Sequence, residues 1–162
     1  MTSPAVLPMA PKTMLTCIVG LGGQCGDDYA GWHVVESLRA LLGPRDNVRL
    51  LIAAMPTDLL QLPRECSRLV IIDACTGLGA PGQTLRQSWP AAPVVQARYG
   101  FGHNLSLSQA LELAASLGQL PADCEVWCVE GRRFSFGEPL SAEVAAACER
   151  VADQISAELL LG

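Results

Sequence analysis

Two aspartates and one histidine are the residues of this sequence best suited to bind a metal ion together. Asp28 follows a glycine-rich loop, Asp73 follows an apolar run, and His103 precedes a segment with helical periodicity. Two carboxylates and one imidazole suit a first-row divalent ion and leave its coordination sphere open. Carboxylates held close together raise one another's pKa or bind a cation. The three residues therefore form a candidate catalytic or metal-binding site.

Each of these residues also has an ordinary structural explanation. Asp28 stands near the start of an expected helix, where a carboxylate caps the helix or interacts favourably with its positive end. Asp73 is able to form an Asx turn, and His103 is able to satisfy backbone groups before a helix. Asp27 is the predicted capping residue of the first helix. His33 lies within that helix and is interpreted as a surface or packing histidine.

Other chemistries are less well supported by the sequence. A GxGxxG dinucleotide fingerprint that begins at Gly20 requires glycine at position 25, where Cys25 stands. Two adjacent acids, Asp27 and Asp28, would also repel a phosphate from the helix entry. No serine has the flanking glycines of a nucleophile elbow, and no cysteine has an evident histidine partner. Nucleotide binding and Ser or Cys nucleophilic catalysis are therefore not favoured.

Strands that alternate with amphipathic helices must position the candidate site. Apolar runs predict strands at 14–21, 48–53, 68–73 and 125–130, and weaker alternation indicates another at 82–89. Helical periodicity predicts helices at 29–42, from 104 or 106 to 117, and at 141–161, with a weak helical stretch at 58–62. Ser106 and Gln109 have capping-box spacing. The apolar stripe of the first helix comprises Val34, Val35, Leu38, Leu41 and Leu42.

This alternation predicts an α/β fold, a three-layer sandwich with a largely parallel central sheet and helices on both faces. Parallel neighbours need crossover connections, and helices supply them on both sides of the sheet. Ligands of such sheets bind beyond the carboxyl ends of the strands. Because Asp28 follows the first strand and Asp73 is expected to end the third, both carboxylates are predicted to meet at one sheet edge.

Composition and charge limit the domain organisation and the partners. The 162 residues, 50% of them apolar, predict a flexible N-terminal extension at 1–12 and a single α/β domain at 13–162. The extension has neither the basic start nor the apolar core of a signal peptide. A net charge of −5 without any basic run makes nucleic acid and membrane surfaces unlikely partners.

Seven cysteines, an odd number without a CxxC pair, predict reduced thiols and a cytoplasmic location. Cys124 and Cys128 lie four residues apart in an expected strand and therefore on one face. No second Cys or His pair follows at zinc-finger spacing. Buried structural thiols are the favoured interpretation of this pair.

Four segments, in this order, resemble the hydrogenase maturation proteases, the endopeptidases that trim the C-terminus of the nickel-iron hydrogenase large subunit. The first resembles the family's opening strand, glycine loop, acidic pair and helix, and the second its second acidic strand end and the loop that follows. The last two resemble its histidine-led helix and its last helix. The segments are IVGLGGQCGDDYAGWHVVESL, RLVIIDACTGLGAPGQTL, GHNLSLSQALELAASLGQLP and FGEPLSAEVAAACERVADQI.

The resemblance implies a function for the candidate site. Asp28, Asp73 and His103 correspond to the three residues with which the family contacts nickel, so residues 13–162 are expected to be a protease domain. The expected activity is removal of a C-terminal peptide from the nickel-loaded precursor of a nickel-iron hydrogenase large subunit. No permanently bound cofactor is expected, because the precursor presents the nickel. Carboxylate and imidazole ligands suit this role.

The sequence departs from the family pattern at three places. Gly23 stands where the glycine loop usually carries asparagine, and Asp28 stands where the acidic pair often ends in glutamate. The shorter carboxylate of Asp28 reaches less far toward a metal. The stretch 53–58 lacks the glycines that usually precede the threonine, here Thr57, so substrate choice is expected to differ there.

Two other functions remain compatible with these residues. A nickel-dependent checkpoint protein would bind the precursor through the same three ligands without cutting it. A metal-independent α/β protein would use the aspartates only as helix caps. Nickel-dependent contact with the precursor distinguishes the first from the second, and loss of peptide mass distinguishes a protease from both.

Overall fold

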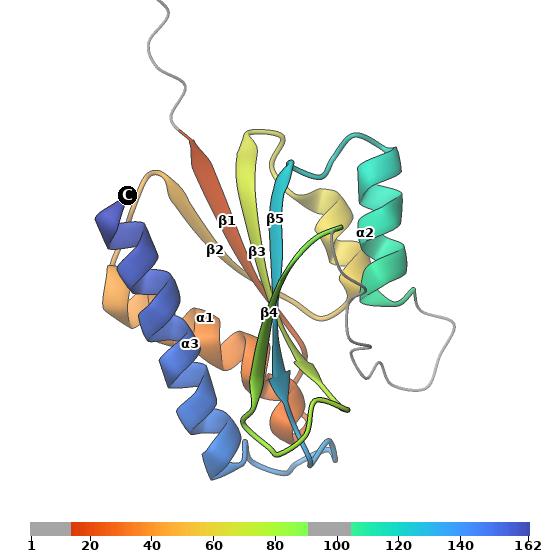
Figure 1. Ribbon diagram of the computed structural model, residues 1–162, viewed down its shortest axis with the longest axis vertical. Coiled ribbons are helices and arrows are strands. Elements are labelled where there is room, and N and C mark those ends of the chain that lie inside the picture. The colour runs from red at the N-terminus through yellow and green to blue at the C-terminus, as the bar shows by residue number, and fades with distance from the viewer. Residues whose placement is uncertain (1–13, 91–104) are drawn as a thin grey trace, which may run out of the picture.

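The computed structural model describes residues 14–90 and 105–162 and places a five-stranded sheet at the centre of the protein (Figure 1). The strands lie in the order β2-β1-β3-β5-β4. Their bounds are β1 Leu15–Leu21, β2 Val48–Ala53, β3 Cys66–Cys75, β4 Thr84–Ser88 and β5 Asp123–Glu130. All pairs are parallel except β4 with β5, which is antiparallel. Each strand predicted from the sequence is present, including the weakly indicated one at 82–89.

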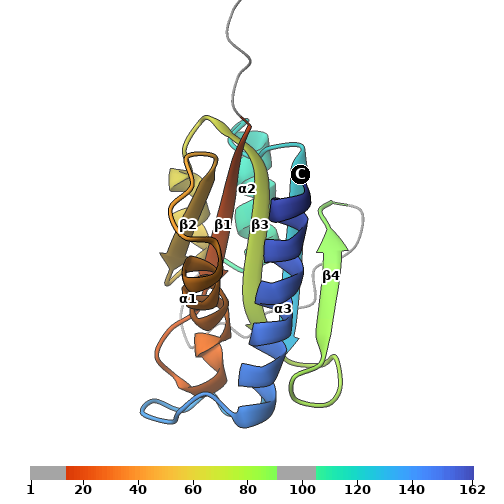
Figure 2. The same ribbon diagram turned by 90° about the vertical axis from the view of Figure 1, so that its left-hand side faces the viewer.

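Helices cover both faces of the sheet, which confirms the predicted three-layer α/β sandwich. Helices α1 (Ala30–Leu42) and α3 (Ala142–Leu161) lie together on one face (Figures 1 and 2). Helix α2 (Leu107–Ser116) and the short 3-10 helix η2 (Pro56–Gln61) lie on the other. Helix η2 corresponds to the weak helical stretch predicted at 58–62. No helix within the described ranges has the length and apolar character needed to cross a membrane.

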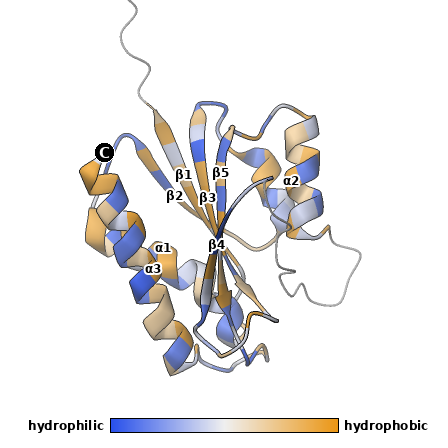
Figure 3. Ribbon diagram, viewed as in Figure 1, coloured by the Kyte–Doolittle hydropathy of each residue, from blue (hydrophilic) through white to orange (hydrophobic). Residues whose placement is uncertain are grey.

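The central strands are apolar on both faces because each face is buried beneath helices. Along β3, Val70 and Ile72 pack beneath α1 and α3, whereas Leu69 and Ile71 pack in the second core with residues of α2 and η2. Figure 3 shows the apolar residues along the central strands and the alternation of apolar and polar residues on the helices. Two cores, one on each side of the sheet, therefore hold the layers together.

The helix ends largely follow their sequence signals. Ser106 and Gln109 form the predicted capping box at the start of α2, with the Ser106 Oγ accepting from the Gln109 backbone N–H at 3.2 Å. The predicted apolar stripe of α1 is buried except for Leu41, which is 49% exposed. Leu41 lies about 60° around the helix from Leu38, on the side away from the sheet.

The predicted N-terminal extension, residues 1–12, lies outside the described residues, and so does His103.

Candidate active site

Asp28 lies in a 3-10 turn, η1 (Gly26–Tyr29), between the glycine loop and α1. The loop folds back onto this turn, because the Gly23 backbone N–H donates to the Asp28 carbonyl at 3.3 Å. Gly22 has a φ of 141°, and a Cβ there would overlap the Asp28 carbonyl oxygen, so this position requires glycine. The carboxyl of Asp28 is half-buried, and burial raises its pKa above the ordinary value.

Position 23 borders the Asp28 carboxylate directly. A Cβ built on Gly23 would stand 3.3 Å from Asp28 Oδ2. The asparagine expected there from the family pattern would therefore lie against this carboxylate. Gly23 itself places no side chain on that side of Asp28.

The prediction that Asp73 ends its strand is wrong, because β3 continues to Cys75. Ladder pairing with β5 extends it, with Ala74 opposite Val129 and Cys75 opposite Glu130. Asp73 is 2% exposed and lies opposite Cys128 in the ladder. Because side chains alternate along a strand, Asp73 lies on the same face as Cys75, which is the face covered by α2.

The structure brings the elements that carry Asp28 and Asp73 together at the carboxyl edge of the sheet. Gly31, in the first turn of α1, packs on the ends of both β1 and β3. A Cβ there would overlap the Leu21 carbonyl oxygen and stand 2.6 Å from that of Ile72. Helix η1 itself contacts β3. The turn that carries Asp28 therefore packs beside the strand end that carries Asp73, as the topology predicted.

His103, the third predicted site residue, lies outside the described residues, so its place in the site stays a prediction. Helix α2 begins four residues later, at Leu107, and packs in the core of the face on which Asp73 lies. Within residues 14–90 and 105–162, no group of three or more His, Cys, Asp or Glu side chains is arranged to hold a metal ion. The described part of the site thus consists of two carboxylates.

Asp27 does not cap the first helix as predicted. Its fully buried carboxylate instead accepts hydrogen bonds from the backbone N–H groups of Arg132 (2.8 Å), Arg133 (3.0 Å) and Ser141 (2.8 Å), and from the Ser141 hydroxyl. Burial opposes the charged form of Asp27, but these hydrogen bonds outweigh burial and lower its pKa below the ordinary value. Asp27 therefore fastens the turn beside Asp28 to the loop before α3.

Glu130 is a second buried acid that sequence reasoning did not single out. Its carboxylate accepts from the backbone N–H groups of Gly77 (3.1 Å) and Leu78 (2.8 Å) and lies 3.7 Å from the Cys75 thiol. It therefore holds the loop that follows Asp73. The available signal was a strand segment, EVWCVE, that ends in an acid at the carboxyl edge of a parallel sheet.

The remaining polar candidates have structural partners. His33 Nε2 lies 2.8 Å from Glu149 Oε1 on the surface between α1 and α3, which agrees with its interpretation as a surface histidine. All seven cysteines fall within the described residues, and all are free thiols. Cys124 and Cys128 are both buried in the core on the α2 side, as predicted for this pair.

The sequence matches the model of one protein family, described as hydrogenase maturation protease, over residues 32–158. The chain belongs to this family. The matched region contains Asp73 and position 103 and begins four residues after Asp28. As a hydrogenase maturation protease, the protein is a peptide-bond hydrolase, and a binding protein without proteolytic activity is not favoured.

Solved structures of other maturation proteases share the fold. The maturating endopeptidase HybD from E. coli superposes with a TM-score of 0.73 at 22% identity, covering 90% of this chain and 92% of that one. The maturation protease HycI from Thermococcus kodakarensis KOD1 gives a TM-score of 0.68 at 21% identity, covering 89% and 91%. A search of curated protein sequences found no match. Because the sequence identities are only 21% and 22%, the structural likeness establishes the fold alone: this protein has the same three-layer fold as those proteases.

Proposed function

We propose that this hydrogenase maturation protease removes a C-terminal peptide from the precursor of a nickel-iron hydrogenase large subunit after nickel has been inserted. The proposal rests most directly on one observation. The half-buried carboxylate of Asp28 and the buried carboxylate of Asp73 come from elements that pack together at the carboxyl edge of the sheet, where α/β folds bind ligands. Family membership supports proteolysis as the reaction.

In this proposal Asp28, Asp73 and His103 contact nickel that the precursor carries. Carboxylates and imidazole are ligands that a borderline divalent ion accepts, and three such ligands leave positions for the precursor's own groups. The nickel belongs to the substrate, and no permanently bound cofactor is expected. An ion in this position signals that the precursor is complete, so the enzyme acts only on loaded substrate.

The buried position of Asp73 supports its role in recognition. A carboxylate that is 2% exposed is costly to ionise unless hydrogen bonds or a cation compensate for the lost hydration. A divalent ion presented at the sheet edge would add to the partners that already stabilise the Asp73 carboxylate. Asp28 is shorter than the glutamate usual at its position and approaches the ion from a half-buried turn, so Asp73 is expected to contribute more to recognition.

The proposed partner is the large-subunit precursor, and neither nucleic acid nor a membrane is a proposed partner. The proposed location is the cytoplasm. Seven free thiols support a reducing compartment.

Substitution of the three proposed ligands tests the proposal. Each of Asp73→Asn, Asp28→Asn and His103→Gln is expected to reduce processing of the nickel-loaded precursor by about 100-fold or more, because each removes a metal contact. The loss of the C-terminal peptide is followed by intact-mass spectrometry. Thermal unfolding by circular dichroism establishes that each variant is folded.

A matched control distinguishes a site effect from a change of charge. Asp123 lies on the same sheet at its opposite, amino edge and is 64% exposed, so Asp123→Asn removes the same charge away from the site. This control is expected to process the precursor normally. Normal processing by a folded Asp73→Asn variant would contradict the proposed role of Asp73, and stable precursor binding by wild-type protein without loss of mass would favour the checkpoint function.

A further inference from the structure

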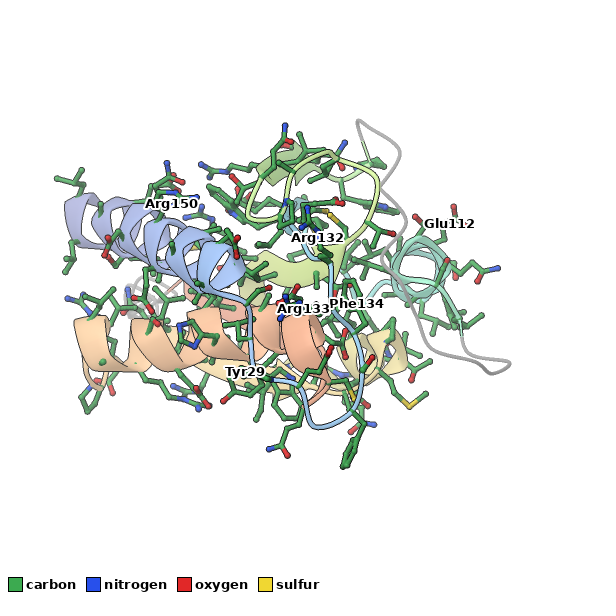
Figure 4. All side chains as sticks on the ribbon, turned by 90° about the horizontal axis from the view of Figure 1, so that it is seen from below. Tyr29, Glu112, Arg132, Arg133, Phe134 and Arg150 are labelled. Atoms are coloured by element: carbon green, nitrogen blue, oxygen red, sulfur yellow. The ribbon has the colours of Figure 1, made fainter. Side chains whose placement is uncertain are left out.

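A basic pocket lies beside the candidate site. It has a volume of about 360 Å³ and opens between the loop before β4, the loop that joins β5 to α3, and the first turn of α3. Figure 4, which views the protein from below, shows Arg132 and Arg133 at this edge, near the start of α3. The pocket is lined by Pro81, Arg132, Arg133, Pro139, Leu140, Ser141, Ala142 and Glu143.

The two arginines of the pocket are available for a ligand. Both are exposed, and within residues 14–90 and 105–162 no acidic group lies within ion-pair distance of either guanidinium. Arg68 and Arg86, in contrast, are each paired with Glu125 and Glu158. Their availability matters because the whole chain carries a charge of −5, which would otherwise repel an anion.

The backbone fixes the arginine pair next to the turn that carries Asp28. The Asp27 backbone N–H donates to the Arg133 carbonyl at 2.6 Å. The Asp27 carboxylate in turn accepts from the backbone N–H groups of Arg132 and Arg133. A Cβ on Gly26 would overlap the Arg133 carbonyl oxygen, so the two loops are packed without a gap. The loop that carries both arginines therefore adjoins the turn that carries Asp28.

We propose that this pocket binds a carboxylate of the C-terminal peptide that the precursor loses. The inference rests on the proposed function and specifies the substrate chemistry of the same site. Guanidinium groups bind carboxylates through paired, charge-assisted hydrogen bonds, and two of them in one pocket favour an anionic group over a neutral one. Glu143, at the pocket wall, opposes an anion and limits the affinity.

The carboxylate has two possible sources, an acidic side chain of the peptide or the α-carboxylate at its end. Synthetic peptides with the sequence of the removed extension separate them. One form has a free C-terminus, one a C-terminal amide, and one has Asn and Gln in place of Asp and Glu. Each is labelled at its N-terminus, and binding to the full-length protein is measured by fluorescence anisotropy at low salt.

The variants are designed as a matched set. Arg132→Gln with Arg133→Gln removes both guanidiniums and keeps the backbone groups that bind Asp27. Arg49→Gln with Arg64→Gln removes the same charge near the amino edge of the sheet, away from the pocket. The pocket variant is expected to bind the peptide about tenfold or more weakly, the control about as wild type, and Glu143→Gln at least as tightly. The wild-type protein is expected to bind one of the two modified peptides, the C-terminal amide or the Asn and Gln form, more weakly than the free-acid peptide. That peptide identifies the source of the carboxylate.

The same variants are then compared on the nickel-loaded precursor. The pocket variant is expected to raise KM for the precursor and to retain the preference for loaded over nickel-free substrate. Peptide binding requires neither nickel nor cleavage. The peptide-binding test therefore remains valid even if processing of the precursor proves not to depend on nickel. Equal affinity of wild type and pocket variant for the free-acid peptide would overturn the inference. If the isolated peptide binds neither protein, an unchanged kcat/KM of the pocket variant on the precursor would overturn it.

Discussion

Asp27 and Asp28 are neighbours in the chain but stand in opposite environments. Asp27 is fully buried, and hydrogen bonds hold its pKa below the ordinary value despite the opposing effect of burial. Burial raises the pKa of Asp28, and no side chain or backbone group within residues 14–90 and 105–162 donates a hydrogen bond to its carboxylate that would offset the loss of hydration. Asp27 therefore stabilises the fold as an anion, whereas burial makes the charged form of Asp28 less favourable.

Replacing Asp27 with asparagine is expected to lower the free energy of unfolding at pH 7 by about 1.5–3 kcal/mol, the range for hydrogen bonds to a charged group. Because the folded pKa of Asp27 is lowered from 3.8, its charge stabilises the protein fully above that pH. This contribution is lost as the pH falls through the folded pKa. Urea unfolding from pH 7 down to the acid transition should show the two proteins converging.

Asp46, which is exposed and whose side chain makes no hydrogen bond or ion pair with another residue of the described part of the chain, supplies the control for this prediction. Asp46→Asn changes the net charge equally and is expected to alter stability by about 0.5 kcal/mol or less. A difference between wild type and Asp27→Asn that persisted undiminished at low pH would contradict the assigned role of the Asp27 carboxylate.

At the residue scale, the sequence predicted that the elements carrying Asp28 and Asp73 meet at one sheet edge, but it missed the residues that hold those elements in place. Asp28 and Asp73 were predicted to lie near each other because a topological rule places the ends of parallel strands together. The function of Asp27 was missed because its partners, Arg132 and Ser141, lie 105 and 114 residues further along the chain. No local pattern distinguishes a carboxylate with four distant donors from a helix cap.

The elements at the carboxyl edge are fixed by two close contacts, one at Gly31 and one at Glu130. Gly31 lets the first turn of α1 approach the ends of β1 and β3, which sets the distance from Asp28 to the sheet. Glu130, at the end of β5, binds the backbone of Gly77 and Leu78 and shapes the loop after Asp73. Each contact connects one half of the candidate site to the sheet.

A methyl group at position 31 is expected to separate α1 from the sheet. Alanine is the better helix former, and propensity alone predicts that Gly31→Ala gains about 1 kcal/mol. The added Cβ would instead overlap the Leu21 carbonyl, so we expect a loss of about 1–3 kcal/mol, together with reduced processing. Chemical denaturation measures the change. A gain in stability would show that the contact between α1 and the sheet at Gly31 is looser than the structure indicates.

Glu130→Gln is expected to loosen the loop after Asp73, because an amide has one acceptor oxygen for the two backbone donors. Hydrogen exchange of the Gly77 and Leu78 amides should accelerate about tenfold, and processing should fall. Glu112→Gln, on the exposed surface of α2 (Figure 4), is the control and should leave both amides unchanged. Unchanged exchange in the Glu130 variant would exclude Glu130 as the anchor of this loop.

At the element scale, the sequence predicted which strands and helices exist more accurately than where they end. The run RLVIID is apolar enough to identify β3, but ladder pairing with β5 decides that the strand continues through Ala74 and Cys75. Likewise, periodicity identified α1, yet the position of the sheet decides that Leu41 faces solvent. Element ends depend on partners that a local pattern does not contain.

For the whole molecule, the order of strands and helices carried most of the functional information. Two crossover connections place β1 and β3 side by side as parallel neighbours, so the elements that carry Asp28 and Asp73, residues 45 positions apart, reach one edge. The basic pocket at the same edge arises from the loop between β5 and α3, which no sequence pattern connected with the acidic pair. Nickel-bearing substrate and its departing peptide would thus meet neighbouring parts of one surface.

Processing of nickel-loaded and nickel-free precursor by the purified wild-type protein shows whether nickel controls cleavage. Both forms of the precursor, from the same source, are incubated with the enzyme, and the products are weighed by intact-mass spectrometry. The nickel-gated site predicts loss of a C-terminal peptide from the loaded form alone. Equal cleavage of both forms would contradict the gate, and cleavage of neither form would contradict the assigned substrate.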